Sequence, residues 1–111
     1  MRPIVVSCLL PLICVSANAQ DGHSASLVMP GCRDALVARG NYQSGMCTGL
    51  VRGVGETGNR LNQVCAPSGV TVEQGLRVVV QFIDQRPNRL HEPFSKLALE
   101  SLSAAWPYLR R

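Results

Sequence analysis

The stretch that decides the fold lies between residues 65 and 107 and reads CAPSGVTVEQGLRVVVQFIDQRPNRLHEPFSKLALESLSAAWP. Thr71 and Gln74 have the spacing of a capping box, which satisfies free backbone amides at the start of a helix. Apolar side chains follow at helical spacing, namely Val72, Leu76, Val79, Val80 and Ile83. The β-branched run 78–80 also fits a strand, but the cap and the length of the pattern favour a helix that Pro87 ends.

A second helix is predicted in the same stretch. It begins near Glu92, with Pro93 at the first helical position, where proline is favoured, and it ends at Pro107. One side of it is lined by Phe94, Leu97, Ala98, Ser101, Leu102 and Ala105. Phe94 and Trp106 are expected to belong to the core. Because only about five residues connect the two helices, we expect them to form an antiparallel hairpin.

Another helix is predicted near the start of the chain, from about Ser26 to Arg39. Ser26 can cap its first amides, and Gly40 can end it in the left-handed conformation that glycine adopts easily. Pro30 falls near the first turn of this helix, where proline is tolerated better than deeper inside.

Residues 45–58 are the least regular part of the pattern. Gly45, Gly49 and Gly53 recur every four residues, so they share one helix face and would let a neighbouring helix approach closely. Each glycine inside a helix costs about 1 kcal/mol relative to alanine, so a flexible loop is the alternative. A phosphate-binding loop is disfavoured because no lysine–serine pair follows the glycines. With this helix, the sequence predicts an all-α fold, a compact four-helix domain.

The N-terminus has the three parts of a secretory signal peptide. The positive Arg2 precedes an almost wholly apolar stretch, 4–15, and the cleavage motif Ala17-Asn18-Ala19 follows that stretch. The apolar stretch is shorter than the roughly 20 residues that span a bilayer, which disfavours a membrane helix. We therefore expect a signal peptide over 1–19 and one domain over 20–111, in the periplasm and with no membrane segment after cleavage.

The composition disfavours several classes of function. The expected mature chain has ten basic and seven acidic side chains, a net charge of only +3, and no basic run, which disfavours nucleic-acid binding. No cysteine–histidine pair has zinc-ligand spacing, so neither a metal nor another cofactor is expected. His91 is the only histidine inside the helical body, which disfavours a cysteine–histidine hydrolase. We therefore expect that the protein is not an enzyme.

Three cysteines follow the predicted signal peptide, namely Cys32, Cys47 and Cys65. An exported domain with three cysteines is expected to hold one disulfide and one leftover thiol, and the sequence allows three pairings. We favour Cys47–Cys65, which would tie the second helix to the loop before the third and contribute about 3 kcal/mol. Cys32 would then be buried as a small apolar residue, or it would pair with a second chain.

These motifs together resemble a known family. The pattern C-x-P-x-G-V-T-x-x-Q begins at Cys65, and a valine-rich helix, a proline turn with a histidine and a helix ending in Trp106-Pro107 follow it. Upstream, residues 47–53 have the pattern C-T-G-x-x-x-G. Over nearly all of the expected mature chain, the sequence resembles the Tai/Rap family of small exported helical proteins, which are associated with immunity to type VI secretion amidase toxins.

The resemblance implies a monomer or homodimer that binds a peptidoglycan-cleaving cysteine amidase and covers its active site. Two positions depart from the family pattern. Leu50 stands where the family usually has tyrosine, and Tyr108 stands where it usually has cysteine after the proline. If that last cysteine normally pairs with the one on the first helix, its loss would explain an unpaired Cys32.

An inhibitor needs an exposed element on a rigid scaffold, and the turn between the third and fourth helices is the candidate. It is short, it is framed by prolines, and it is rich in hydrogen-bonding side chains. The expected partner-binding residues are Arg86, Asn88, Arg89, His91 and Glu92. The alternative is a solvated helix connection, in which His91 caps the next helix or packs under the turn.

A second class of function stays open, that of a general periplasmic helical protein such as a stress chaperone. Such a protein would bind many unfolded clients weakly and loosen at low pH, whereas an immunity protein would bind one partner tightly. Two histidines and seven acidic side chains disfavour a strong acid switch. An exposed Trp106 beside Tyr108 would indicate a homodimer surface.

Overall fold

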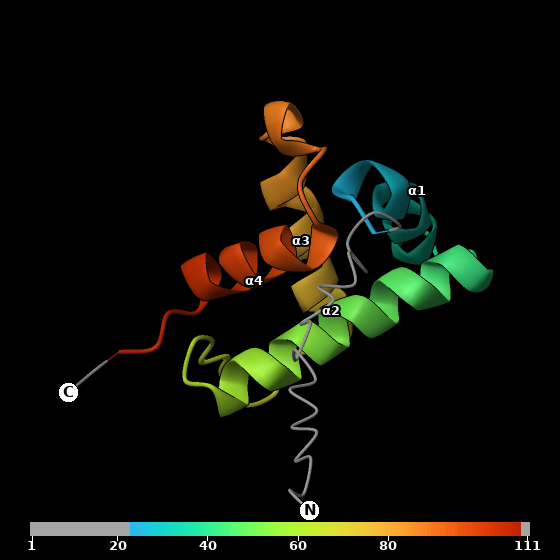
Figure 1. Cartoon of the computed structure of the whole chain (residues 1–111). Coiled ribbons are helices and arrows are strands. Elements are labelled where there is room, and N and C mark those ends of the chain that lie inside the picture. Colours follow the sequence, from blue (N-terminus) through green and yellow to red (C-terminus); the bar gives the residue numbers. More distant parts are fainter. Residues whose placement is uncertain (1–22, 110–111) are drawn as a thin grey trace, which may run out of the picture.

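The computed structural model describes residues 23–109, so the predicted signal peptide and its cleavage site lie outside the described residues. It contains the helices α1 (Ala25–Leu36), α2 (Tyr42–Arg60), α3 (Val72–Asp84), η1, a short 3-10 helix (Pro87–Arg89), and α4 (Phe94–Ala105) (Figure 1). This part of the chain has no strand, and none of its helices is long and apolar enough to cross a membrane. The prediction of an all-α four-helix domain is confirmed.

Two helices begin with capping boxes, of which the sequence revealed one. In α3, the Gln74 amide donates to Thr71 Oγ1 at 3.2 Å and the Thr71 amide donates to Gln74 Oε1 at 2.8 Å. In α2, the Ser44 amide donates to Asn41 Oδ1 at 2.8 Å and the Asn41 amide donates to Ser44 Oγ at 2.9 Å. The second box was missed because serine replaces the usual glutamate or glutamine. Helix α2 therefore begins at Tyr42, earlier than predicted, and the loop alternative for this segment is wrong.

Helix α1 is shorter than predicted. Its N-cap is Ser24 rather than Ser26, and the Ser24 side chain makes no capping hydrogen bond. The helix ends at Leu36, after which Ala38 adopts a φ of 55°. The left-handed residue that follows the helix is thus not Gly40, and α1 ends earlier than a glycine cap would place it.

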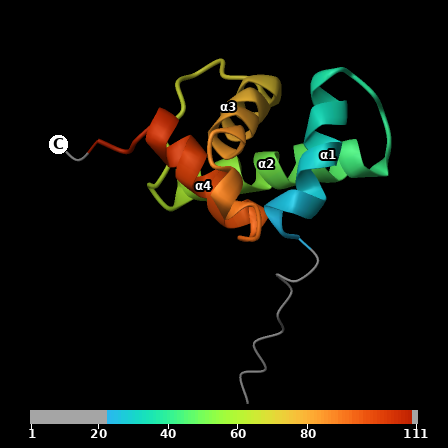
Figure 2. The same ribbon diagram turned by 90° about the horizontal axis from the view of Figure 1, so that it is seen from above.

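Helix α2 is the centre of the fold. Helix α1 lies against its N-terminal part, and α3 and α4 pack across the rest of it (Figures 1 and 2). Phe94 is fully buried, as predicted, and Trp106 is partly buried at the edge of the core. The other buried apolar residues are Ala25, Val28, Met29, Cys32, Cys47, Val51, Val64, Leu76, Val79, Val80, Ile83, Leu97, Ala98 and Leu102.

Helices α3 and α4 contact each other but cross steeply, so the predicted antiparallel hairpin is wrong (Figure 1). The connection between them runs from Gln85 to Pro93 and contains η1, which makes it longer than the sequence suggested. Because η1 adds a turn of chain at the end of α3, α4 does not fold straight back along α3. The connection instead forms a protruding element, and this is where the predicted binding residues lie.

The glycines that allow close packing are not the predicted ones. A Cβ atom at Gly31 would lie 2.3 Å from the carbonyl oxygen of Gln43, so α1 and α2 touch there through their backbones. In contrast, a Cβ atom at Gly45, Gly49 or Gly53 would have nothing within 4 Å. The prediction of a tightly packed glycine face is therefore wrong. Helix α2 turns its opposite side to the core, with Ser44, Cys47, Val51 and Gly58.

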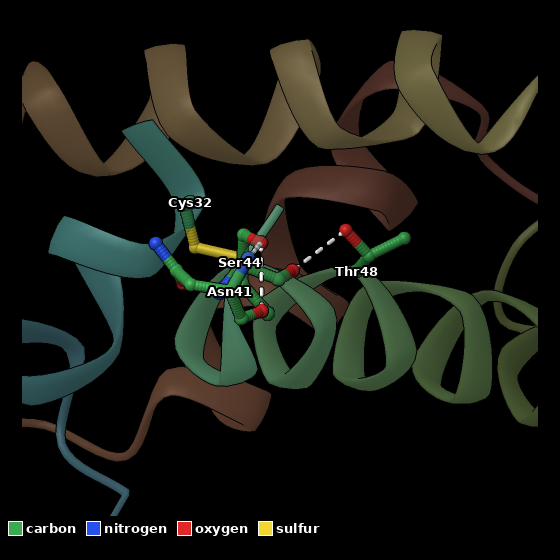
Figure 3. Close-up of a disulfide and its surroundings, with 5 residues drawn as sticks. Cys32, Asn41, Ser44 and Thr48 are labelled. Atoms are coloured by element: carbon green, nitrogen blue, oxygen red, sulfur yellow. Dashed lines mark hydrogen bonds between the residues drawn. A yellow bond between two sulfur atoms is a disulfide. The ribbon is translucent and has the colours of Figure 1, made fainter. Parts of the chain in front are cut away.

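The disulfide joins Cys32 of α1 to Cys47 of α2, and both side chains are fully buried (Figure 3). The predicted Cys47–Cys65 pair is therefore wrong, and Cys65 is an exposed free cysteine. Gly31 lets α1 approach the start of α2, which brings Cys32 and Cys47 together with their Cα atoms 5.3 Å apart. Cys65 follows the far end of α2, where its amide donates to the carbonyl oxygen of Trp106 at 2.8 Å.

Candidate functional site

The predicted binding turn, residues 86–92, connects the end of α3 to the start of α4 and contains η1. Its five candidate residues lie close together but differ in their surroundings. Arg86, Arg89 and Glu92 are partly buried and have partners within the molecule, which are Phe82, Glu92, Lys96 and Glu100. Asn88 and His91 are exposed, and within residues 23–109 neither side chain forms a hydrogen bond or ion pair.

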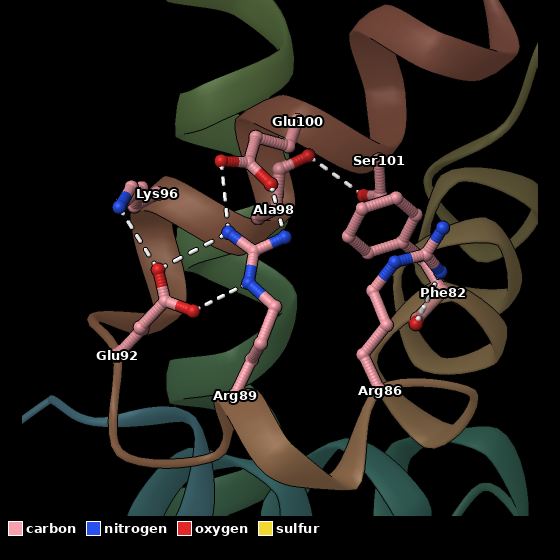
Figure 4. Close-up of polar contacts among 8 residues, drawn as sticks. All are labelled: Phe82, Arg86, Arg89, Glu92, Lys96, Ala98, Glu100 and Ser101. Carbon is pink, nitrogen blue, oxygen red and sulfur yellow. Dashed lines mark hydrogen bonds and ion pairs between the residues drawn. The ribbon is translucent and has the colours of Figure 1, made fainter.

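Arg89 is the centre of an ion-pair cluster with Glu92, Lys96 and Glu100 (Figure 4). Its Nε atom donates to Glu92 Oε2, and its Nη2 atom donates to Glu92 Oε1 at 3.1 Å and to Glu100 Oε1 at 3.0 Å. Its Nη1 atom lies 2.7 Å from Glu100 Oε2. Lys96 Nζ donates to Glu92 Oε1 at 2.9 Å. Because the side chains of Arg89 and Glu92 are only 25% and 18% exposed, water screens this cluster less than an isolated surface pair.

The cluster shifts the acid–base equilibria of its members. Hydrogen bonds from Arg89, and then from Lys96, lower the pKa of Glu92 to about 2. The hydrogen bond from Arg89 also lowers the pKa of Glu100, and the bonds to Glu92 and Glu100 raise the pKa of Arg89. These carboxylates and the guanidinium are therefore all ionised at neutral pH, and the cluster persists well into the acidic range.

Arg86 turns back onto the helix that precedes it. Its guanidinium lies over the ring of Phe82, 3.6 Å from the centroid, and its Nη1 atom donates to the Phe82 carbonyl oxygen at 2.9 Å (Figure 4). In a regular helix the Arg86 amide would donate to the Phe82 carbonyl oxygen, but here it donates to the carbonyl oxygen of Ile83. The Arg86 side chain therefore satisfies a carbonyl group that α3 leaves free. Arg86 thus caps the negative end of α3 and has a structural role.

The backbone of the turn also caps α1. The amides of Ala25 and Ser26 donate to the carbonyl oxygens of Glu92 and Leu90, each at 2.9 Å. These are two of the amides that a helix leaves free at its start, and Ser24 does not satisfy them with its side chain. The conformation of the turn and the start of α1 are therefore linked.

A second set of backbone contacts lies beside the first. The Phe94 amide donates to the carbonyl oxygen of His23 at 2.8 Å, and Ser24 and Pro93 form an isolated antiparallel bridge. These contacts could not be predicted from the sequence, because they join segments far apart in the chain through backbone groups that almost every residue possesses. They fix the end of the turn against the start of the described chain.

A comparison of sequences identifies the family of this chain. The family model of the Rap1a immunity proteins matches residues 12–108. The chain belongs to the Rap1a immunity protein family. The resemblance that the motifs of the sequence predicted is confirmed, and the role of the family is immunity against a toxin, exercised on another protein. No curated protein and no solved structure matches the chain significantly.

In this Rap1a-family protein the free thiol lies far from the turn. The backbone amide of Cys65 is hydrogen-bonded to Trp106, just after the end of α4, whereas His91 precedes the start of α4. Helix α4 has 12 residues and is therefore about 18 Å long, so Cys65 and His91 do not form a nucleophile–base pair. Within the described residues, no group of three or more His, Cys, Asp or Glu side chains could hold a metal ion.

An open groove between α2 and α4 lies next to the turn. Its volume is about 770 Å³, and Gly49 and Gly53 of α2 line it together with Lys96 of α4. Leu61, which is 62% exposed, lines it as well. The glycine face of α2 is therefore open surface in the described structure, adjacent to the start of α4.

Proposed function

We propose that this Rap1a-family protein is a periplasmic immunity protein that binds a peptidoglycan amidase toxin of a type VI secretion system and covers the toxin's active site. The observation that carries the proposal is the family match over residues 12–108, which gives the immunity role. The amidase target is what the resemblance to the Tai/Rap family implies. A toxin that cleaves peptidoglycan acts in the periplasm, so the protein that inhibits it would have to be in the periplasm as well.

Two features support a periplasmic location. Residues 1–19 have the charge, the apolar stretch and the cleavage motif of a secretory signal peptide. The buried disulfide between Cys32 and Cys47 is of a kind that forms and persists in oxidising compartments such as the bacterial periplasm. Export would bring the protein to the compartment in which the amidase acts.

The turn supports a mode of binding in which a preformed element enters a cleft. Asn88 and His91 are exposed. The amide of Asn88 has a carbonyl oxygen and an NH2 group, and the imidazole of His91 has two ring nitrogens, so both side chains can form hydrogen bonds with a partner. Arg89 and the contacts with α1 fix the backbone around them. A preformed loop loses little conformational entropy on binding, which favours high affinity. Such a loop would block the amidase cleft and would need no chemistry of its own.

A pull-down of the mature chain, residues 20–111, from periplasmic extract of its own organism tests the proposal. Mass spectrometry should identify one stoichiometric peptidoglycan amidase. The Asn88→Ala/His91→Ala double variant should lose that amidase. Arg60→Ala is the matched control, because Arg60 is exposed at the far end of α2, and this variant should retain the amidase.

Two results would contradict the proposal. Weak binding of many unrelated unfolded proteins would indicate a chaperone-like role, and the absence of any amidase would leave the immunity role without this target. If the amidase is captured, light scattering on the free protein and on the complex decides whether the protein acts as a monomer or a homodimer. The expected complex contains the amidase and the immunity protein in equal numbers.

A further inference from the structure

We infer that Arg89 is a positioning residue, and that the partner is contacted by the exposed edge of the turn, at Asn88 and His91. The inference rests on the proposed function and deepens it, because it says how the same turn is presented to the toxin. Arginine is common at interface hot spots, which is why the sequence alone pointed to Arg89 as a contact residue. In the structure, the contacts of the Arg89 side chain lie within the molecule, which fits a positioning role.

All three guanidinium nitrogens of Arg89 are already engaged. Nε and Nη2 bond to Glu92, Nη2 also bonds to Glu100, and Nη1 pairs with Glu100 (Figure 4). A carboxylate of a partner would have to displace one of these bonds. Removing one partner from a covered ion pair leaves the other charge uncompensated, which is costly. Arg89 is therefore a poor candidate for a direct contact.

The same bonds tie the middle of the turn to its last residue and to α4. Glu92 is the last residue of the turn and Glu100 lies within α4, so Arg89 at the end of η1 clips η1 to both. The carbonyl groups of Leu90 and Glu92 are bound by the first amides of α1. A turn held from two sides has little freedom left to lose when it binds. What Arg89 contributes to binding is this preorganisation.

The edge that stays exposed carries no permanent charge. Pro87, Asn88 and His91 form it, and their side chains offer an amide and an imidazole but neither a carboxylate nor a guanidinium. The charges of Arg89 and Glu92 face each other instead of the partner. The fitting surface is thus a narrow cleft lined by neutral hydrogen-bonding groups, such as backbone amides and carbonyl groups. Affinity for such a surface depends little on salt.

The test uses two variants of the mature chain that separate positioning from contact. Glu100→Ala removes one partner of Arg89, and it should speed hydrogen exchange about tenfold at the amides of Ala25 and Phe94 in the free protein. The same variant should weaken binding to the captured amidase about tenfold. Asn88→Ala should leave hydrogen exchange unchanged and weaken binding by about tenfold or more.

A matched control removes an ion pair elsewhere. Arg77→Gln opens the exposed pair that Arg77 Nη2 forms with Glu73 Oε1 at 2.8 Å within α3, and it should change neither hydrogen exchange nor affinity. Wild-type affinity should change less than about threefold between low and high salt, since no charged group of the turn meets the partner. Glu100→Ala should fold, because it leaves Arg89 paired with Glu92.

Two outcomes would overturn the inference. The first is unchanged hydrogen exchange at the amides of Ala25 and Phe94 in Glu100→Ala; if this variant then also binds the amidase more weakly, the charged cluster is a contact. The second is a steep salt dependence of the wild-type affinity. If the wild-type chain binds no amidase at all, the proposed function fails, and the exchange data still decide whether the cluster holds the turn.

Discussion

The backbone amide of Cys65 donates a 2.8 Å hydrogen bond to the carbonyl oxygen of Trp106, so the free thiol lies beside the segment that follows α4. Tyr108 belongs to that segment and is 46% exposed. The Tai/Rap pattern usually has cysteine after this proline, where the chain has tyrosine. Such a cysteine would stand two residues after Trp106, whose carbonyl oxygen Cys65 binds, so we expect it to pair with Cys65. Cys32 is already paired with Cys47.

Tyr108→Cys should form a second disulfide with Cys65. The hydrogen bond to Trp106 keeps the two positions near each other, and closing this loop should add about 4 kcal/mol to the free energy of unfolding in the chain-entropy model. Peptide mapping by mass spectrometry under non-reducing conditions would detect the bond, and urea denaturation with and without reductant would measure its effect. Tyr108→Ser is the control. Two free thiols after oxidation would contradict this placement of Cys65.

Removing the existing disulfide should cost about 3 kcal/mol of unfolding free energy. The Cys32→Ala/Cys47→Ala double variant opens a link between residues with a sequence separation of 15, at a site that is fully buried. Cys65→Ala should change stability by less than about 0.5 kcal/mol, because this cysteine is exposed and free. Urea denaturation of the three proteins compares them directly. A large loss in Cys65→Ala would instead favour the pairing predicted from the sequence.

Substitution by alanine should have opposite effects on stability at an open glycine and at a tightly packed one. Gly49→Ala should stabilise α2 by up to about 1 kcal/mol, since the added Cβ atom would meet nothing within 4 Å. Gly31→Ala should destabilise the protein by about 3 kcal/mol, since its Cβ atom would lie 2.3 Å from the Gln43 carbonyl oxygen. Urea midpoints would show the two signs. If Gly49→Ala also destabilised the free protein, the glycine face of α2 would be packed after all.

Stability should depend on pH through the cluster around Arg89. The pKa of Glu92 is lowered from 4.5 to about 2 in the folded protein, so the unfolded chain binds more protons in this interval. The contribution of Glu92 is therefore present above about pH 4.5 and is lost as the pH falls toward 2. Glu100, whose pKa is also lowered, adds in the same direction.

Urea denaturation at neutral, mildly acidic and strongly acidic pH would measure this dependence. Stability should be nearly constant down to about pH 5 and then fall. Glu92→Gln should be less stable at neutral pH and should show a shallower fall. Glu73→Gln, which alters the exposed pair with Arg77, is the control and should follow the wild-type curve. A wild-type curve that rises toward low pH would contradict the assigned roles of both carboxylates.

Local signals in the sequence predicted the elements well. The capping box at Thr71 and Gln74, the apolar spacing that follows it and the prolines at 87, 93 and 107 gave α3 and α4 close to their observed bounds. Each of these signals acts within one or two turns of chain, so the sequence carries it directly. The end of α1 was predicted less well, because Ala38 takes a left-handed conformation that is usually left to glycine or asparagine.

Features that depend on tertiary contacts were not predictable in the same way. The spacing of Gly45, Gly49 and Gly53 defines a face but does not say which face the core covers. The three cysteines allow three pairings, and the choice depends on the crossing of α1 and α2 at Gly31.

The turn itself was predicted from the sequence, but the contacts of its side chains were not. The prolines and polar side chains marked the turn, but the partners of Arg89 include Glu100 on the next helix. The caps of α1 are backbone carbonyl groups from the turn, at Leu90 and Glu92, which leave no trace in side-chain patterns. Which side chains of the turn have partners within the molecule, and which stay exposed, is therefore visible only in the folded chain.

The most direct measurement is the rate at which the captured amidase hydrolyses purified peptidoglycan while the mature chain is titrated into the reaction. Hydrolysis should fall linearly and stop at one chain per amidase, as expected for tight binding that covers the active site. The Asn88→Ala/His91→Ala double variant should require a large excess for the same effect. Undiminished hydrolysis at a tenfold excess of folded wild-type protein would contradict the claim that this protein is an amidase inhibitor.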